Sequence, residues 1–111
     1  MKSKVKVERG SDNIFADLGF PDAEERMLKA QIVAEIYRLA KAGKLTQVQT
    51  GKVLGISQPE VSRMFHGYFE EYSVERLMRF LTAFGHDLEI VSRPRKGTRK
   101  AGKISFTPIA A

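Results

Sequence analysis

Cysteine is absent from this 111-residue sequence. Disulfide bonds, thiolate zinc sites and cysteine nucleophiles are therefore excluded. Long apolar runs are absent too: none approaches the roughly 18 residues that a membrane-spanning helix needs, and no apolar stretch follows the basic N-terminus to form a secretory signal. We therefore expect a cytoplasmic protein without a membrane span. With 42% hydrophobic and 29% charged residues, the chain can bury the core of one small domain.

Signals of enzymatic or metal chemistry are scarce. The two histidines, His66 and His86, lie far apart in the chain with no third ligand at a recognisable spacing. No nucleophile elbow, glycine-rich phosphate loop or HExxH segment occurs. The adjacent acids at 24–25 and 70–71 are typical of a helix first turn and a solvated loop, although the second pair could also keep a loop away from a DNA backbone. The sequence therefore predicts no enzyme, cofactor or bound metal.

Positive charge is concentrated at the two ends of the chain. The formal net charge is +6, yet residues 93–103 alone hold six Lys and Arg without an acid, and residues 1–9 hold four against Glu8. The remaining middle part is mildly acidic. We divide the chain into a basic N-terminal arm (1–21), a folded domain (22–92) and a basic C-terminal tail (93–111). The charge of the ends fits a polyanionic or acidic partner, or simple solubility.

Capping motifs and apolar periodicity predict an all-α bundle of about five helices. The first element is a short apolar arm within residues 11–20, expected to dock through Ile14, Phe15, Leu18 and Phe20. The later helices are expected to begin at the capping boxes of residues 22–25, 46–49 and 57–60 and at the Ser73 cap. Glycines at 43, 55, 67 and 85 are expected to end them.

One short strand is predicted after the last helix. Residues 87–92 alternate in polarity, with Leu88 and Ile90 on one side. A lone strand is not stable without a partner, and residues 2–8 and 104–107 are weak candidates for one. The simplest partner is the same strand of a second copy, which places Leu88 and Ile90 at a homodimer interface.

Residues 46–67 contain two short helices joined by a glycine turn. Helices that cross through such a turn need a residue without bulk at the crossing and apolar residues on their inner faces. Gly51 meets the first need, and Leu54, Ile56, Val61 and Met64 meet the second. The residues left on the outer face of the second helix are polar, apart from one proline: Gln58, Pro59, Ser62, Arg63 and His66.

This outer face has the chemistry to enter the major groove of double-stranded DNA. Gln can bond adenine and Arg can bond guanine in bidentate fashion, each good pair giving roughly 1–3 kcal/mol of discrimination. We predict that bases are read by Gln58, Pro59, Ser62 and Arg63. Capped helix starts and nearby cations suit phosphates, which predicts contacts from Lys44, Thr46, Gln47, Lys52, Ser57 and Tyr68. Glu60 either completes its capping box, the interpretation we favour, or accepts from cytosine. The alternative for the whole motif is a helical hairpin with a solvated polar face.

The sequence of the motif resembles a known family. Residues 45–63 read Leu-Thr-Gln-Val-Gln-Thr-Gly-Lys-Val-Leu-Gly-Ile-Ser-Gln-Pro-Glu-Val-Ser-Arg and are similar to the DNA-binding motif of the XRE family of helix-turn-helix regulators, whose fold is lambda-repressor-like. Residues 13–25 and 72–90 resemble the HigA-like antitoxin branch. The resemblance implies a dimeric repressor of its own operon in a HigBA-like module, beside a RelE-like toxin. It also implies base reading by Gln58, Pro59, Ser62 and Arg63 and a phosphate contact by Gln47.

Three residues depart from the usual motif, among them Glu60, which stands where many relatives carry a neutral or basic residue. Two other functions also stay open. Thr50 stands where an apolar residue is usual, and Gly51 where Ala is usual, so this helix is expected to be less stable in isolation by roughly 1 kcal/mol for the glycine alone. The chain could be a solitary XRE regulator without a toxin. It could also be a protein-binding adaptor or toxin-neutralising module that no longer reads DNA.

Overall fold

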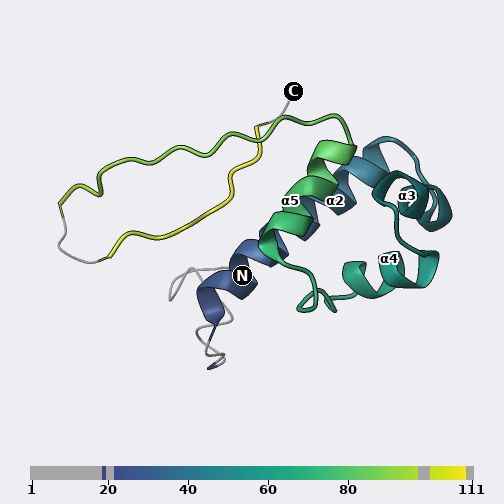
Figure 1. Cartoon of the computed structure of the whole chain (residues 1–111), viewed down its shortest axis with the longest axis horizontal. Coiled ribbons are helices and arrows are strands. Elements are labelled where there is room, and N and C mark those ends of the chain that lie inside the picture. Colours follow the sequence, from purple (N-terminus) through teal and green to yellow (C-terminus); the bar gives the residue numbers. More distant parts are fainter. Residues whose placement is uncertain (1–18, 20–21, 98–100, 110–111) are drawn as a thin grey trace, which may run out of the picture.

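The computed structural model describes residues 19, 22–97 and 101–109. Four helices lie in this part of the chain: α2 (Ala23–Ala42), α3 (Gln47–Leu54), α4 (Gln58–Phe65) and α5 (Val74–Ala83) (Figure 1). The all-α prediction is confirmed, with four rather than about five helices in the described residues. Except for Gly19, the predicted apolar arm lies outside them, including Ile14, Phe15, Leu18 and Phe20. None of the four helices is long and apolar enough to cross a membrane.

The predicted capping boxes form at α3 and α4. At α3, the backbone N–H of Gln49 donates to the Thr46 hydroxyl (3.1 Å), and the backbone N–H of Thr46 donates to the Gln49 side chain (2.8 Å). At α4, Ser57 and Glu60 make the same two bonds at 3.3 and 2.9 Å. Ser73 caps α5 as expected by accepting from the backbone N–H of Arg76 at 3.0 Å. The N-termini of α3, α4 and α5 are therefore fixed by local hydrogen bonds, and the Ser57 box fixes the point where the turn between α3 and α4 enters α4.

The predicted capping box at Asp22 is wrong. Asp22 precedes α2, but its side chain makes no capping hydrogen bond. Its backbone has φ −111° and ψ 43°, not the extended conformation that Thr46 and Ser57 adopt. The carboxylate instead accepts from Arg26 Nε at 2.9 Å, and this hydrogen bond lowers the pKa of Asp22.

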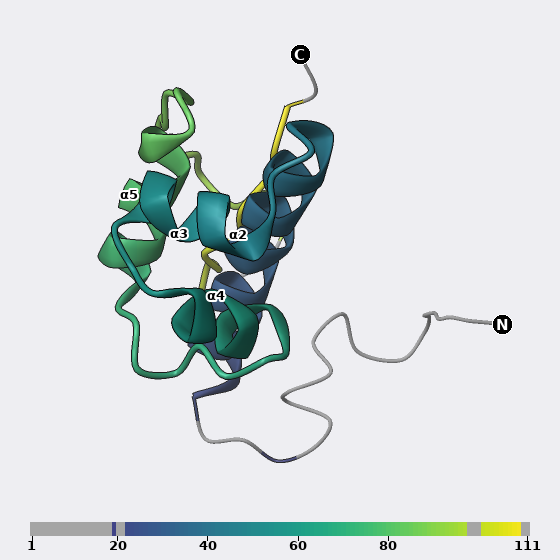
Figure 2. The ribbon, with the colours of Figure 1, turned by 90° about the vertical axis from the view of Figure 1, so that its right-hand side faces the viewer.

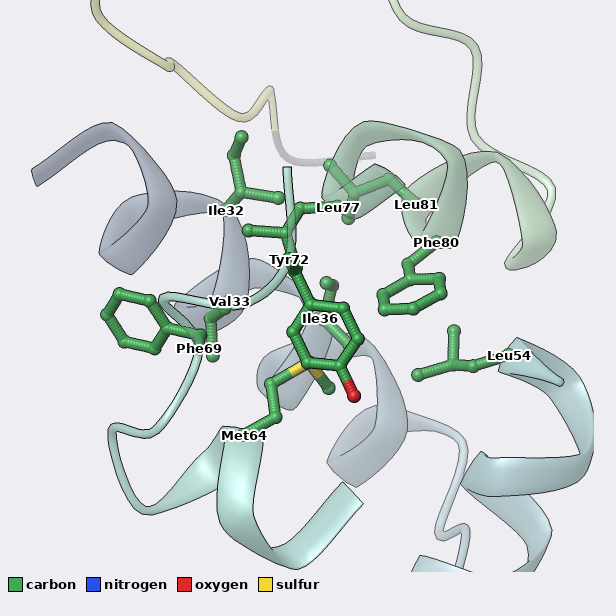
Figure 3. Packing of buried hydrophobic residues seen from close by; sticks show 10 residues of the cluster. All are labelled: Ile32, Val33, Ile36, Leu54, Met64, Phe69, Tyr72, Leu77, Phe80 and Leu81. Atoms are coloured by element: carbon green, nitrogen blue, oxygen red, sulfur yellow. The ribbon is translucent and has the colours of Figure 1, made fainter. Parts of the chain in front are cut away.

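One hydrophobic core joins the four helices and the loop between α4 and α5. Figure 3 shows its ten buried side chains, in which Phe69 and Tyr72 of that loop lie among residues of the helices. The buried residues of α2 and α5 recur three or four positions apart, as the apolar periodicity of the sequence predicts, and α2 lies against α5 along the core. The largest fully buried side chains are Ile32, Ile36, Val61, Met64, Leu77 and Leu81, together with Thr50. Burial of this surface is the main force that holds the short α3 and α4 in place.

The predicted strand at 87–92 does not form in the single chain. Neither residues 86–95 nor residues 101–109 are assigned to a strand, and Figure 1 shows the first segment leaving the helices and the second running back to them. A strand needs hydrogen bonds to the backbone of a neighbouring strand. Two backbone N–H groups of residues 101–109 instead donate to side chains of α2. Ile104 donates to Glu24 Oε2 (3.4 Å) and Phe106 donates to Gln31 Oε1 (3.3 Å). Ile90 is consequently 86% exposed.

Candidate nucleic-acid interface

The turn between α3 and α4 brings their backbones into very close approach. A Cβ atom built on Gly51 would lie 2.5 Å from the carbonyl oxygen of Ile56, a separation that real Cβ atoms essentially never show. The carbonyl of Gly51 accepts from the backbone N–H groups of Gly55 (2.7 Å) and Ile56 (3.0 Å). Gly55 has φ +77°, a left-handed conformation that favours glycine. Gly51 is therefore the crossing residue that the sequence predicted.

Helix α4 has an inner and an outer face. Val61 and Met64 are fully buried on the inner face. Gln58, Pro59 and Arg63 are exposed, whereas Ser62, the fourth predicted base-reading residue, is only partly exposed. Figure 2 shows α3 and α4 next to each other on one side of the molecule. The geometry therefore presents three of the four predicted readers openly to a ligand and the fourth in part.

A side-chain hydrogen bond joins the first residues of α3 and α4. Gln58 Nε2 donates to Gln47 Oε1 at 2.6 Å. A glutamine amide has two N–H donors and one oxygen that accepts, so this bond uses only one donor of Gln58. The amide of Gln58 is therefore oriented by Gln47 while part of its hydrogen-bonding capacity stays available for a base edge. The sequence suggested both residues but not the bond between them.

The remaining predicted phosphate contacts lie on α3 and on the loops that flank α3 and α4. Lys44 and Thr46 precede α3, Lys52 lies within it, Ser57 precedes α4 and Tyr68 follows it; all five are exposed, and Gln47 is partly exposed. The side chain of Tyr68 is 64% exposed, an unusual state for an aromatic residue in so small a fold. The helix-turn-helix motif and its flanking loops therefore expose one aromatic and several hydrogen-bonding side chains besides those of α4.

Two polar residues of α4 have structural roles. The backbone N–H of Ser57 donates to Glu60 and holds the pKa of the Glu60 carboxyl below its usual range, so this acid serves the capping box, as expected. His66 ends the helix, and its Nδ1 lies 2.7 Å from the carbonyl of Ser62, to which it donates. Within the described residues, no group of three or more His, Asp and Glu could hold a metal ion.

Arg63 also has a partner that the sequence did not predict. Its Nη2 lies 3.0 Å from Glu71 Oε1 in the loop after α4, and both side chains are about half exposed. The two residues are eight apart and lie on different elements, so no helical spacing signals the pair. The hint in the sequence is that the acidic pair at 70–71 follows a helix whose outer face carries an arginine.

A capped helix pair with a tight glycine turn and an exposed polar second helix defines a helix-turn-helix DNA-binding protein. Residues 14–93 match a family model described as a helix-turn-helix domain. A solved structure of a candidate XRE-family transcriptional regulator is 38% identical in sequence with a TM-score of 0.74, over 80% of this chain and 100% of that one. No curated protein matches the sequence. The chain belongs to the XRE family of helix-turn-helix transcriptional regulators, which are DNA-binding proteins and not enzymes.

Proposed function

We propose that this XRE-family chain is a dimeric, sequence-specific repressor of its own operon and the antitoxin of a HigBA-like toxin–antitoxin module. It reads operator bases through Gln58, Pro59, Ser62 and Arg63. It contacts phosphates through Lys44, Thr46, Gln47, Lys52, Ser57 and Tyr68. The observation that carries base reading is the division of α4 into a fully buried inner face and an exposed outer face with a glutamine and an arginine.

The outer face of α4 suits the major groove for two reasons. Its exposed residues include one side chain that can bond adenine N6 and N7 and one that can bond guanine O6 and N7. The capping boxes and the Gly51 contact fix both helices, so the readers are presented on a rigid support. Rigid presentation lowers the ordering cost of binding and favours recognition of bases over loose attraction to phosphate.

Dimerisation is supported by the exposed apolar residues of the C-terminal segments. Large apolar side chains are exposed at Ile90 (86%), Val91 (62%), Ile104 (66%) and Ile109 (85%). Exposed apolar residues on an extended segment are a ready surface for strand pairing with a second copy. Ile90 fits the proposed interface better than Leu88, because Leu88 is partly buried against the core of its own chain. Two copies would present two α4 helices to the two halves of an operator.

The antitoxin role is supported by the sequence resemblance of residues 13–25 and 72–90 to the HigA-like branch. A RelE-like toxin encoded by the neighbouring gene is the partner that it implies. Growth of cells that express the neighbouring gene, with and without this chain, tests the role directly. Relief of growth arrest supports an antitoxin, and unrelieved arrest, or a neighbour that does not arrest growth, favours a solitary regulator.

The DNA-binding proposal is tested by fluorescence anisotropy. The purified chain is titrated onto duplex DNA from just upstream of its gene and onto a scrambled duplex, at two salt concentrations. We expect sub-micromolar preference for the upstream duplex that survives physiological salt. The double variant Q58A/R63A should lose roughly 30-fold or more of that affinity, since each bidentate contact gives about 1–3 kcal/mol.

The matched control is R79A. Arg79 is an exposed arginine that pairs with Glu75 at 3.2 Å, much as Arg63 pairs with Glu71. R79A removes the same charge from a different helix and should keep the preference. Equal binding of the wild type to both duplexes, lost on adding salt, would contradict base reading. Toxin neutralisation without operator preference would favour the adaptor alternative.

A further inference from the structure

We propose that Glu71 is a specificity-determining residue that positions Arg63: it holds the guanidinium so that Arg63 engages a guanine edge rather than a phosphate. The inference rests on the proposed function, because it concerns the choice between bases and backbone. It assigns a role to the Glu71 carboxylate beside Arg63. Without such a role, this negative charge would only repel the phosphates of DNA.

The geometry of the pair leaves Arg63 able to read a base. A single contact joins Arg63 Nη2 to Glu71 Oε1 at 3.0 Å. A guanidinium carries five N–H donors in a fixed plane, so most of them remain when one is bonded to the carboxylate. A guanine edge needs two donors, for O6 and N7. Arg63 can therefore keep Glu71 as a support and still form the bidentate contact.

The backbone at Glu71 is held in place by its neighbours in the loop, independently of Arg63. Its neighbour Glu70 accepts from Arg26 Nη1 at 3.0 Å, and the Glu70 backbone carbonyl accepts from Lys29 Nζ at 3.1 Å. Lys29 is only 6% exposed, so this anchor lies within the packed structure. On the other side, Tyr72 is 3% exposed and lies in the core (Figure 3). The loop is thus tied to α2 on one side of Glu71 and to the core on the other.

The effect of Glu71 differs for the two kinds of DNA contact. A phosphate is an anion that competes with the carboxylate for the guanidinium and is repelled by it. A guanine edge is neutral and is engaged by donors that the carboxylate does not use. Exposed ion pairs contribute little to folding and are screened by salt, so stability alone gives no account of this pair. Its arrangement disfavours phosphate binding by Arg63 while preorganising base binding.

The chain offers a matched control pair on another helix. Arg79 Nη2 lies 3.2 Å from Glu75 Oε2, and both side chains are more than two-thirds exposed. This pair spans one turn of α5 and involves no residue predicted to contact DNA. E75Q therefore removes the same unit of negative charge from beside an exposed arginine, without touching a proposed reader.

The experiment compares E71Q and E75Q with the wild type by anisotropy on the upstream and the scrambled duplexes over a series of salt concentrations. A glutamine at 71 can still accept from Arg63, so E71Q removes the charge and leaves a hydrogen-bond partner. We expect E71Q to bind the scrambled duplex several-fold more tightly. Its log affinity against log salt should steepen by about 0.9, the value for one more phosphate contact. The upstream-to-scrambled ratio should fall by about fivefold or more, whereas E75Q should leave ratio and slope unchanged.

Two further comparisons separate the possible failures. In an R63A background, E71Q should change neither ratio nor slope, because Glu71 acts through Arg63; a persistent change would overturn the proposal. An E71Q variant that melts like the wild type and keeps its ratio and slope, or an E75Q variant with the same effect, would overturn it as well. These results leave the proposed function standing. Equal wild-type binding to both duplexes would instead overturn the proposed function and this inference together.

Discussion

Replacing Gly51 with alanine should destabilise the protein, although alanine is the better helix former. In an exposed helix interior the change from glycine to alanine gains about 1 kcal/mol. Here the added Cβ would lie 2.5 Å from the backbone carbonyl oxygen of Ile56, well short of the 3.4 Å at which ordinary contact begins. The clashing atom belongs to the backbone, so no side-chain rotation relieves the overlap. The turn between α3 and α4 must move by close to an ångström.

The size of the effect follows from the two opposing contributions. Overpacking a well-packed site costs typically about 1–3 kcal/mol. The moving turn also carries the bonds from the backbone N–H groups of Gly55 and Ile56 to the Gly51 carbonyl. We therefore expect a net loss of about 1 kcal/mol in the free energy of unfolding, which corresponds to roughly 4–8 °C in Tm for a domain of this size. Because α4 moves with the turn, operator affinity should fall at the same time.

Thermal unfolding followed by circular dichroism, together with anisotropy on operator DNA, measures both effects. Gly43 is the matched control: its backbone is right-handed helical, and a Cβ there would meet Leu39 and Leu45 atoms at an ordinary 3.5 Å. G43A should be neutral or slightly stabilising, by about 0.4–1 kcal/mol. A G51A variant that melts higher than the wild type and binds the operator unchanged would refute the reasoning. It would mean that the turn relaxes without cost.

Three other changes have defined expectations. The Tyr72 hydroxyl is buried without a hydrogen-bond partner among the described residues, so Y72F should keep or raise the free energy of unfolding, by up to about 1 kcal/mol, in urea titrations; a loss of more than that would reveal a partner. Glu35 is buried and accepts from Arg38 at 2.8 and 2.7 Å, bonds that hold its pKa below the ordinary 4.5. The stability contributed by this pair is present above the ordinary pKa and is lost as pH falls through the lower folded-state value. E35Q should therefore cost about 1 kcal/mol at pH 7 and progressively less as the pH falls below 4.5, and a cost that does not change with pH, measured by urea unfolding, would contradict this. Ile90→Glu should convert the proposed dimer to a monomer in sedimentation and weaken operator binding, because it places a charge on an exposed apolar position of the proposed interface. An unchanged dimer would remove Ile90 from the interface.

Features governed by nearby residues could be predicted from the sequence. The capping boxes at Thr46 and Ser57 link residues three apart, and the αL glycine at 55 ends α3 as expected. The need for a residue without bulk at Gly51 also followed from the motif alone. The departure from the usual alanine, by contrast, predicted only that α3 is less stable in isolation. The structure adds the reason for the departure from alanine: the approach of the Ile56 carbonyl leaves no room for a Cβ.

Features governed by distant residues could not be predicted. The Arg63–Glu71 pair depends on a loop whose position is set by Arg26, 44 residues from its partner Glu70 in the chain. The failed capping box at Asp22 is a local exception, because the Asp22 carboxylate accepts from Arg26 within one helical turn instead of capping α2. The predicted strand at 87–92 finds no strand partner within the described residues and does not form there. Each error concerned a missing or competing partner rather than a wrong local preference.

The two faces of α4 have different evolutionary freedom. Val61 and Met64 are fully buried, so their substitution would disturb the core and with it the whole fold. Gln58, Pro59 and Arg63 are exposed, and none belongs to the buried core. Mutations at these three positions can therefore accumulate at little cost to folding, and under the proposed function each would change which bases are favoured. A duplicated copy of this gene could acquire a separate operator through a few surface substitutions while keeping the same scaffold.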